Sequence, residues 1–110
     1  MSTDRPVAVD PWAPFDGHEQ VVVARDEATG CELVVAIHST VLGPALGGVR
    51  LSGYTTAASP RAAAYADALR LSRAMTYKNA LAQLPHGGGK GVIVRDPDLA
   101  TDDMLRAFGR

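Results

Sequence analysis

The chain has 110 residues, of which 46% are hydrophobic and 21% are charged, and its formal net charge is -1 at pH 7. This length suits one domain or part of one, and the composition is typical of a soluble globular protein. The charge balance lacks the basic excess of a nucleic-acid-binding protein. Its single cysteine, Cys31, excludes an internal disulfide and favours a reducing compartment, for which we expect the cytoplasm.

Neither a metal site nor a membrane segment is indicated by the sequence. His18, His38 and His86 lack the spacing of a metal-ligand set. No apolar run approaches the length that spans a membrane, and the N-terminus lacks the basic-then-apolar pattern of a signal peptide. We therefore expect no metal and no membrane partner.

The first half of the chain is predicted to form an arm and a hairpin. Residues 1–16 contain three prolines and little periodicity, which predicts a loosely ordered N-terminal arm before a domain at residues 17–110. Two β-rich runs at residues 19–25 and 31–38 flank a turn-rich segment and predict a hairpin. Residues 42–50 include four glycine or proline positions and predict a loop or a short strand.

A long helix is predicted from residue 60 to residue 82. Ser59 is a suitable N-cap and Pro60 fits the first helical position. Leu71 and Met75, four residues apart on one face, are expected to make the apolar contacts of this alanine-rich helix. Residues 91–94 are a further strand candidate, and residues 101–103 have the pattern of a second helix start. The expected fold is α/β, a short mixed sheet with the long helix across one face.

Two lysines, Lys78 and Lys90, stand twelve residues apart in the segment 75–94. Lys78 lies near the end of the helical pattern, where a charged lysine can hold an anion. Lys90 follows three consecutive glycines, which let the backbone approach a ligand closely. An amine held in a partly dry pocket gives up its proton more readily and can act as a base. One anchoring cation and one basic amine suit an enzyme that acts on a small acid.

Two other interpretations of this segment compete with a catalytic one. A nucleoside-triphosphate loop requires Gly, four residues and then Gly-Lys-Ser/Thr. Leu84 occupies the first glycine position and Gly91 replaces the hydroxyl residue after Lys90, so the pattern fails at two required places. A structural turn between helix and strand, with both lysines solvated, is the simpler alternative, and it would be favoured for Gly-Gly-Gly-Lys alone.

Three linked blocks of sequence resemble the Glu/Leu/Phe/Val family of amino-acid dehydrogenases, with the nearest likeness to its leucine and valine members. The blocks occupy residues 42–50, 68–80 and 86–90, and the resemblance extends from about residue 17 to the last residue. Residues 51–60 form a segment that is a few residues longer than the family pattern.

The resemblance implies a truncated N-terminal substrate-binding and dimerisation domain of an enzyme that oxidatively deaminates a branched-chain L-amino acid to its 2-oxo acid with NAD. The implied partners are the amino acid or 2-oxo acid and further copies of the chain.

The resemblance also implies roles at individual positions. Lys90 matches the catalytic lysine of the family, whose unprotonated amine helps to activate the water that attacks the imine formed after hydride transfer. Lys78 matches the lysine that binds the α-carboxylate of the substrate. Leu46 stands where glutamate-specific members have a lysine. This favours an aliphatic substrate, because burying an uncompensated carboxylate would cost on the order of several kcal/mol.

Gly47, Gly48 and Met75 are implied to border the substrate, although turn or core roles remain open for all three. No Gly-x-Gly-x-x-Gly pattern with a downstream acid occurs, so we expect no cofactor-binding residue in this chain. The catalytic Asp and the dinucleotide-binding domain of the family would follow residue 110, and the isolated chain is expected to be inactive. The alternatives are a non-catalytic module that only self-associates and a small-acid-binding protein without turnover.

Overall fold

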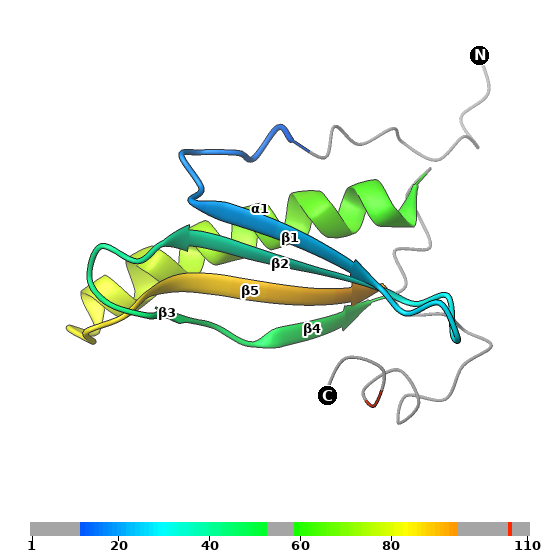
Figure 1. Ribbon diagram of the computed structural model, residues 1–110. Helices are drawn as coiled ribbons and strands as arrows, with labels where there is room; N and C mark the ends of the chain where they lie inside the picture. Colours follow the sequence, from blue (N-terminus) through cyan, green and yellow to red (C-terminus); the bar gives the residue numbers. More distant parts are fainter. Residues whose placement is uncertain (1–11, 53–58, 95–105, 107–110) are drawn as a thin grey trace, which may run out of the picture.

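The computed structural model describes residues 12–52, 59–94 and 106, and it shows a five-stranded sheet with a long helix across one face (Figure 1). The elements are β1 (Gln20–Arg25), β2 (Glu32–Ser39), β3 (Ala45–Leu46), β4 (Val49–Ser52), α1 (Pro60–Leu81) and β5 (Gly87–Val94). β1 pairs with β2 and β2 with β5 in antiparallel fashion, whereas β3 and β4 both run parallel to β5. The predicted α/β fold with a short mixed sheet is confirmed.

The hairpin of β1 and β2 lies within one residue of the predicted position. Its turn is closed by Asp26, whose carboxylate accepts bonds from the backbone N–H and the hydroxyl of Thr29 at 3.0 and 2.7 Å. Gly30 follows with a φ of 73°, a left-handed conformation that glycine adopts without strain. Cys31 is a buried free thiol directly before β2, in agreement with the absence of an internal disulfide.

α1 begins where the capping signals predict. The Ser59 hydroxyl oxygen accepts the N–H of Ala62 at 3.2 Å, and Pro60 is the first helical residue. Lys78 lies in the last turn, where a cation is favoured by the helix dipole. No helix in the described part of the chain is long and apolar enough to cross a membrane.

The core contacts of α1 differ from the prediction. The buried apolar residues of the helix are Ala64, Ala68 and Leu69, which pack against β2 and β5. Leu71 and Met75, the pair expected to make these contacts, are only half-buried. The prediction was wrong because the helix approaches the sheet through small residues, so the pair of large side chains is displaced to its flank.

The strand predicted at residues 91–94 begins at Gly87, so the glycine-rich segment is a strand and not a turn. The physical reason is a close contact with α1. A Cβ atom on Gly88 would overlap the backbone N of Thr76 and the carbonyl O of Ser72. Glycine here lets the second half of α1 lie directly on β5.

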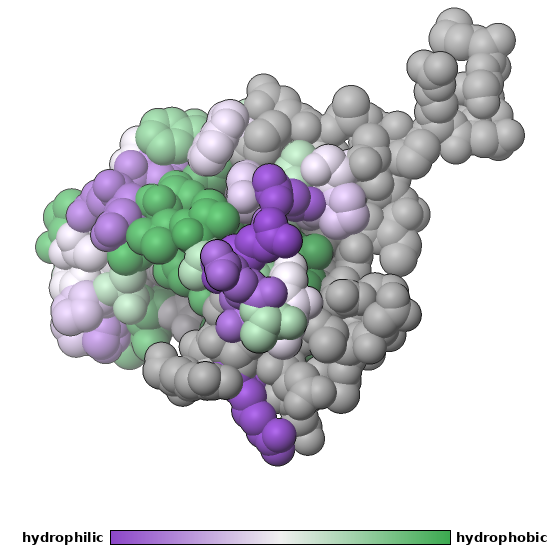
Figure 2. Space-filling view, turned by 45° about the vertical axis from the view of Figure 1, so that its right-hand side comes forward, coloured by the Kyte–Doolittle hydropathy of each residue, from purple (hydrophilic) through white to green (hydrophobic). Residues whose placement is uncertain are grey.

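The face of the sheet away from α1 carries no helix among the described residues. Hydrophobic side chains gather over the strands there, as Figure 2 shows. They include Val35 and Leu33 of β2 and the exposed Val49 of β4, all of which surround the position of Gly91 on this face. The helix start predicted at residues 101–103 and the first eleven residues of the arm lie outside the described residues.

Candidate functional site

Lys90 lies near the middle of β5, on the sheet face that α1 covers. Gly88 and Val92, two residues to either side, both contact or face α1, and strand alternation places Lys90 on the same face. The residue opposite it in β2 is Ala36, and the Lys90 side chain is half-buried. On its other side lies Gly48, where an added Cβ atom would stand 3.3 Å from the Lys90 amine nitrogen.

The two glycines between β3 and β4 have different surroundings. A Cβ atom on Gly47 would overlap the carbonyl O of Gly89 in β5, so Gly47 has a packing reason to be glycine. Gly48 has only the amine nitrogen of Lys90 within contact distance of that position. Of the two, only Gly48 therefore adjoins the space around the Lys90 amine.

Lys78 and Met75 lie on the flank of α1 that faces β4. This flank is identified by Asp67, which pairs with Arg50 of β4 at 3.6 Å. Lys78 lies about three helical turns beyond Asp67 and returns to the same side of the helix. Met75 is one turn before Lys78 and is half-buried. The structure thus brings both lysines to the side of the helix–sheet layer where β3 and β4 pair with β5.

Leu46 ends β3, where it is in register with Gly88 of β5. Because Gly88 faces α1, Leu46 projects on the same side of the sheet. Its side chain is 43% exposed and lies at the C-terminal end of the helix, near the turn that contains Lys78. An apolar side chain is therefore available next to the predicted carboxylate anchor.

Sequence reasoning missed Asn79, the residue directly after Lys78. Its side chain is only 3% exposed, and its amide nitrogen donates to the carbonyl oxygens of Gly87 at 2.8 Å and Leu46 at 3.2 Å. Asn is a poor residue for a helix interior unless its side chain finds such partners. That preference was the one local signal that could have identified it.

Comparison with protein families shows to which family the chain belongs. Residues 18–110 match the family model of the Glu/Leu/Phe/Val dehydrogenase dimerisation domain. The chain belongs to the Glu/Leu/Phe/Val dehydrogenase family. The match covers all six positions singled out from the sequence, and the family assignment made from the three sequence blocks is confirmed.

Individual relatives of this dehydrogenase-family chain are amino-acid dehydrogenases. It is 57% identical to a valine dehydrogenase of Streptomyces virginiae over 86% of this chain and 25% of the relative. It is 52% identical to a leucine dehydrogenase of Bacillus subtilis over 84% of this chain and 25% of the relative. The crystal structure of L-tryptophan dehydrogenase from Nostoc punctiforme has a TM-score of 0.73 and 49% identity over 84% of this chain and 27% of that chain. The chain thus spans about a quarter of the length of these relatives.

A second polar cluster ties the arm of this dehydrogenase-family domain to α1. The ring of His18 is buried, its Nδ1 accepts the N–H of Asp16 at 3.1 Å, and its Nε2 lies 2.7 Å from the carbonyl O of Leu69. These partners place the ring proton on Nε2. Burial, the largest influence, lowers the pKa of His18. His38 packs edge-on against this ring at 4.7 Å between centroids and bonds the Thr76 hydroxyl at 2.8 Å.

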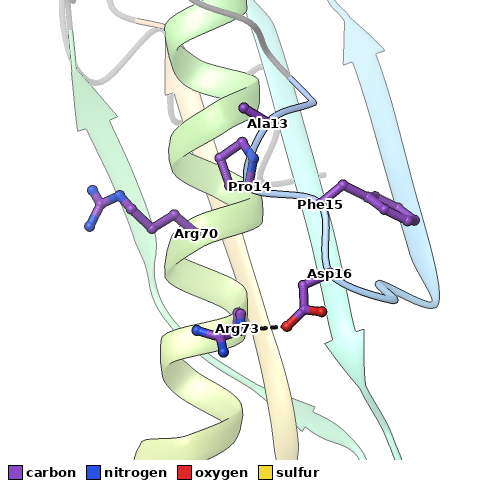
Figure 3. A pocket seen from close by; sticks show the side chains of 6 residues that line it. All are labelled: Ala13, Pro14, Phe15, Asp16, Arg70 and Arg73. Atoms are coloured by element: carbon purple, nitrogen blue, oxygen red, sulfur yellow. Dashed lines mark hydrogen bonds and ion pairs between the residues drawn. The ribbon is translucent and has the colours of Figure 1, made fainter.

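A pocket of about 350 Å³ lies between the arm and α1, and Figure 3 shows its lining side chains. Arg73 on its wall pairs with Asp16 at 2.6 Å, which raises the pKa of the arginine, and the guanidinium also stacks over Tyr77. Arg70 pairs with Asp67 at 2.9 Å. Both guanidinium groups therefore already have carboxylate partners, and no lining residue belongs to the predicted site. The lining consists of Ala13, Pro14, Phe15, Asp16, Arg70 and Arg73. No group of metal-ligating side chains occurs in the described ranges 12–52 and 59–94.

Proposed function

We propose that this chain is the substrate-binding part of an NAD-dependent dehydrogenase that oxidatively deaminates a branched-chain L-amino acid to its 2-oxo acid. The observation that supports this most strongly is the position of the Lys90 amine beside Gly48, on the same side of α1 as Lys78. Family membership supports the class of reaction. The apolar Leu46 at the same end of the helix supports an aliphatic substrate.

The proposed mechanism assigns a separate task to each lysine. Lys78 binds the α-carboxylate of the substrate through a charge-assisted contact. Lys90 acts as the general base and takes a proton from water as the water oxygen bonds to the carbon of the protonated imine and the C=N electron pair moves to nitrogen. The hydroxyl proton of the resulting carbinolamine then passes to its nitrogen, the C–N bond breaks, and ammonia leaves the 2-oxo acid. Leu46 and Met75 would contact the aliphatic side chain, and Gly48 leaves room beside the amine.

The described residues do not fit a dinucleotide. Their glycine-rich run at residues 87–89 lies in a strand, where α1 and the neighbouring strands occupy the positions above the glycines. A pyrophosphate would need free backbone N–H groups at the start of a helix. We therefore propose that a separate domain of the complete enzyme binds NAD.

Self-association is the second candidate role. The matched family model is that of a dimerisation domain. Among the described strands β1 is an outer strand, and the edge of such a strand can pair with another chain. We propose that the complete enzyme is a homo-oligomer. Sedimentation of the 110-residue chain at roughly tens of micromolar, a concentration that reveals weak association, should show more than a monomer.

A chimaeric dehydrogenase separates the two roles. In it, residues 18–110 replace the matching segment of the Streptomyces virginiae valine dehydrogenase, and NADH formation is measured with L-valine, L-leucine and L-glutamate. The proposal predicts turnover of the aliphatic substrates, little turnover of glutamate, and no NADH from the 110-residue chain alone. A chimaera that assembles like the parent enzyme but turns over none of the substrates would support an assembly module and overturn the catalytic proposal.

A further inference from the structure

We propose that Asn79 is a positioning residue of the site described above. Its side-chain amide fixes β3 and the start of β5 relative to the turn of α1 that contains Lys78. This inference rests on the proposed function, because the geometry that Asn79 holds is that of the two lysines.

The contacts of Asn79 join three elements through one buried group. Its amide nitrogen has two N–H donors, and it donates to two carbonyl oxygens, those of Gly87 in β5 and Leu46 in β3. Leu46 and Gly87 belong to the parallel pair of β3 and β5. Both donors therefore bond backbone groups of adjacent strands, and loss of the amide would leave both carbonyls without this partner.

The strand that Asn79 bonds is short. β3 is only two residues long, and among the described strands it pairs with β5 alone. Gly47 follows it, and a Cβ atom there would strike the carbonyl O of Gly89. A short strand has few ladder hydrogen bonds, so the single bond from Asn79 to Leu46 is a large share of what fixes the distance of β3 from α1.

The backbone of Asn79 also fixes the reversal of the chain after α1. Its carbonyl O accepts the N–H of Leu84 at 2.9 Å, and Gln83 between them has a left-handed φ of 58°. The chain then returns as β5, which leads to Lys90. Asn79 therefore contacts both the end of α1, where Lys78 lies, and the start of β5, the strand that contains Lys90.

The separation of the two lysines is therefore linked to Asn79. Lys78 precedes it in the chain, and Lys90 lies on the strand whose first residue it bonds. Substrate-positioning groups are sensitive to small displacements, since about 1 Å of misplacement can cost roughly 100-fold in rate. Removing the Asn79 amide should therefore reduce turnover, although Asn79 does not contact the substrate in the proposed mechanism.

Ser72 offers a matched control on the same helix. It is also fully buried and polar, and it faces the sheet two turns before Asn79. Its hydroxyl donates to the carbonyl O of Leu69 at 2.9 Å and lies 3.0 Å from Nε2 of His18. The side chain of Ser72 is therefore bonded to α1 and His18, and not to β3. Replacing it should cost stability in a similar way and leave the lysines in place.

The test compares Asn79→Ala, Asn79→Ser and Ser72→Ala in the chimaeric dehydrogenase, at a temperature where circular dichroism shows each variant folded. We expect kcat/KM for L-valine to fall by roughly 10- to 100-fold in Asn79→Ala, with both kcat and KM affected. Asn79→Ser keeps one donor and should fall less, and Ser72→Ala should stay within about twofold of the parent. Should Asn79→Ala fail to fold, the same criterion applies to Asn79→Ser, which retains a hydroxyl donor in a smaller side chain.

Parallel behaviour of the Asn79 and Ser72 variants, whether both keep or both lose turnover, would overturn the inference and assign Asn79 a purely structural role. Two further variants, Lys78→Ala and Lys90→Ala, separate this failure from failure of the proposed function. If both lysine variants keep normal kinetics, the proposed function is wrong. If both fail while Asn79→Ala behaves like Ser72→Ala, only the role of Asn79 is wrong.

Discussion

The two halves of α1 contact the same sheet in different ways. The first half packs through Ala64, Ala68 and Leu69 onto valines of β2 and β5 and forms the buried apolar core with them. The second half places Ser72 and Asn79 over the glycines of β5, where polar side chains and backbone meet. The small residues at the contact are alanines of α1 in the first half and glycines of β5 in the second half.

This difference separates the sources of stability and of site geometry. Buried apolar side chains contribute stability in proportion to the area they remove from water. Where α1 lies close to the glycines of β5, less apolar area is buried, and hydrogen bonds fix the helix and the strands at defined positions. Substitutions in the first half should therefore unfold the protein, whereas substitution of Asn79 in the second half should alter the site first.

The largest loss of stability is expected from Leu69→Ala in the first half. Leu69 is the largest fully buried side chain among the described residues, so its truncation leaves a cavity and should lower the free energy of unfolding by about 2–5 kcal/mol. Urea denaturation of the 110-residue chain measures this change. The kinetics of folded chimaeric Leu69→Ala should match the parent, and a selective loss of kcat would show that the two halves are not separable.

A smaller loss is expected from Gly47→Ala, and almost none from Gly48→Ala. The added methyl group at Gly47 meets a backbone carbonyl that cannot rotate away, so we expect a loss of about 1–3 kcal/mol. At Gly48 the methyl group meets only the flexible end of Lys90. Gly48→Ala should keep the urea midpoint but lower kcat of the chimaera. Equal destabilisation by both substitutions would contradict the different surroundings of these glycines.

The smallest effect concerns the pH dependence of stability through His18. Its pKa is lowered from the usual 6.5 in the folded state, chiefly by burial, so the unfolded chain binds its proton first as the pH falls. Stability should therefore decrease as the pH drops below about 6.5, by less than about 1.4 kcal/mol per pH unit for one proton. Above that pH the group should contribute no pH dependence.

Urea denaturation between pH 5 and 8, a range of about three units around the histidine titration, compares the parent chain with His18→Gln. The variant should lose the part of the slope that His18 contributes. His38, Asp16 and Arg73 lie close enough to influence the ring and remain in both proteins. Identical slopes for the two proteins would contradict the assignment.

The sequence allowed prediction of those features that depend on local signals. The hairpin follows from two β-rich runs around a turn, and the start of α1 follows from Ser59 and Pro60. The family, and with it the choice of Lys78 and Lys90, followed from three short blocks whose order was more specific than any one of them. These signals lie within a few residues of the features that they predict.

The remaining features depend on contacts between distant residues. Glycines in isolation indicate a turn, and only the backbone of α1 above Gly88 explains why they form a strand. The role of Asn79 requires the carbonyl of Leu46, which is 33 residues away in sequence. The pairing of His18 with His38 likewise depends on the packing of the arm. No local pattern contains this information.

The contrast between Lys90→Ala and Lys78→Ala in the chimaeric dehydrogenase tests the central claim most directly. If Lys90 is the base, its loss should lower kcat by about 10²- to 10⁴-fold with little change in KM. If Lys78 is the carboxylate anchor, its loss should raise KM steeply and leave the shape of the pH–rate profile unchanged. A Lys90→Ala enzyme with near-normal kcat and the parental pH–rate profile would contradict the claim and make the glycine-rich strand a structural element only.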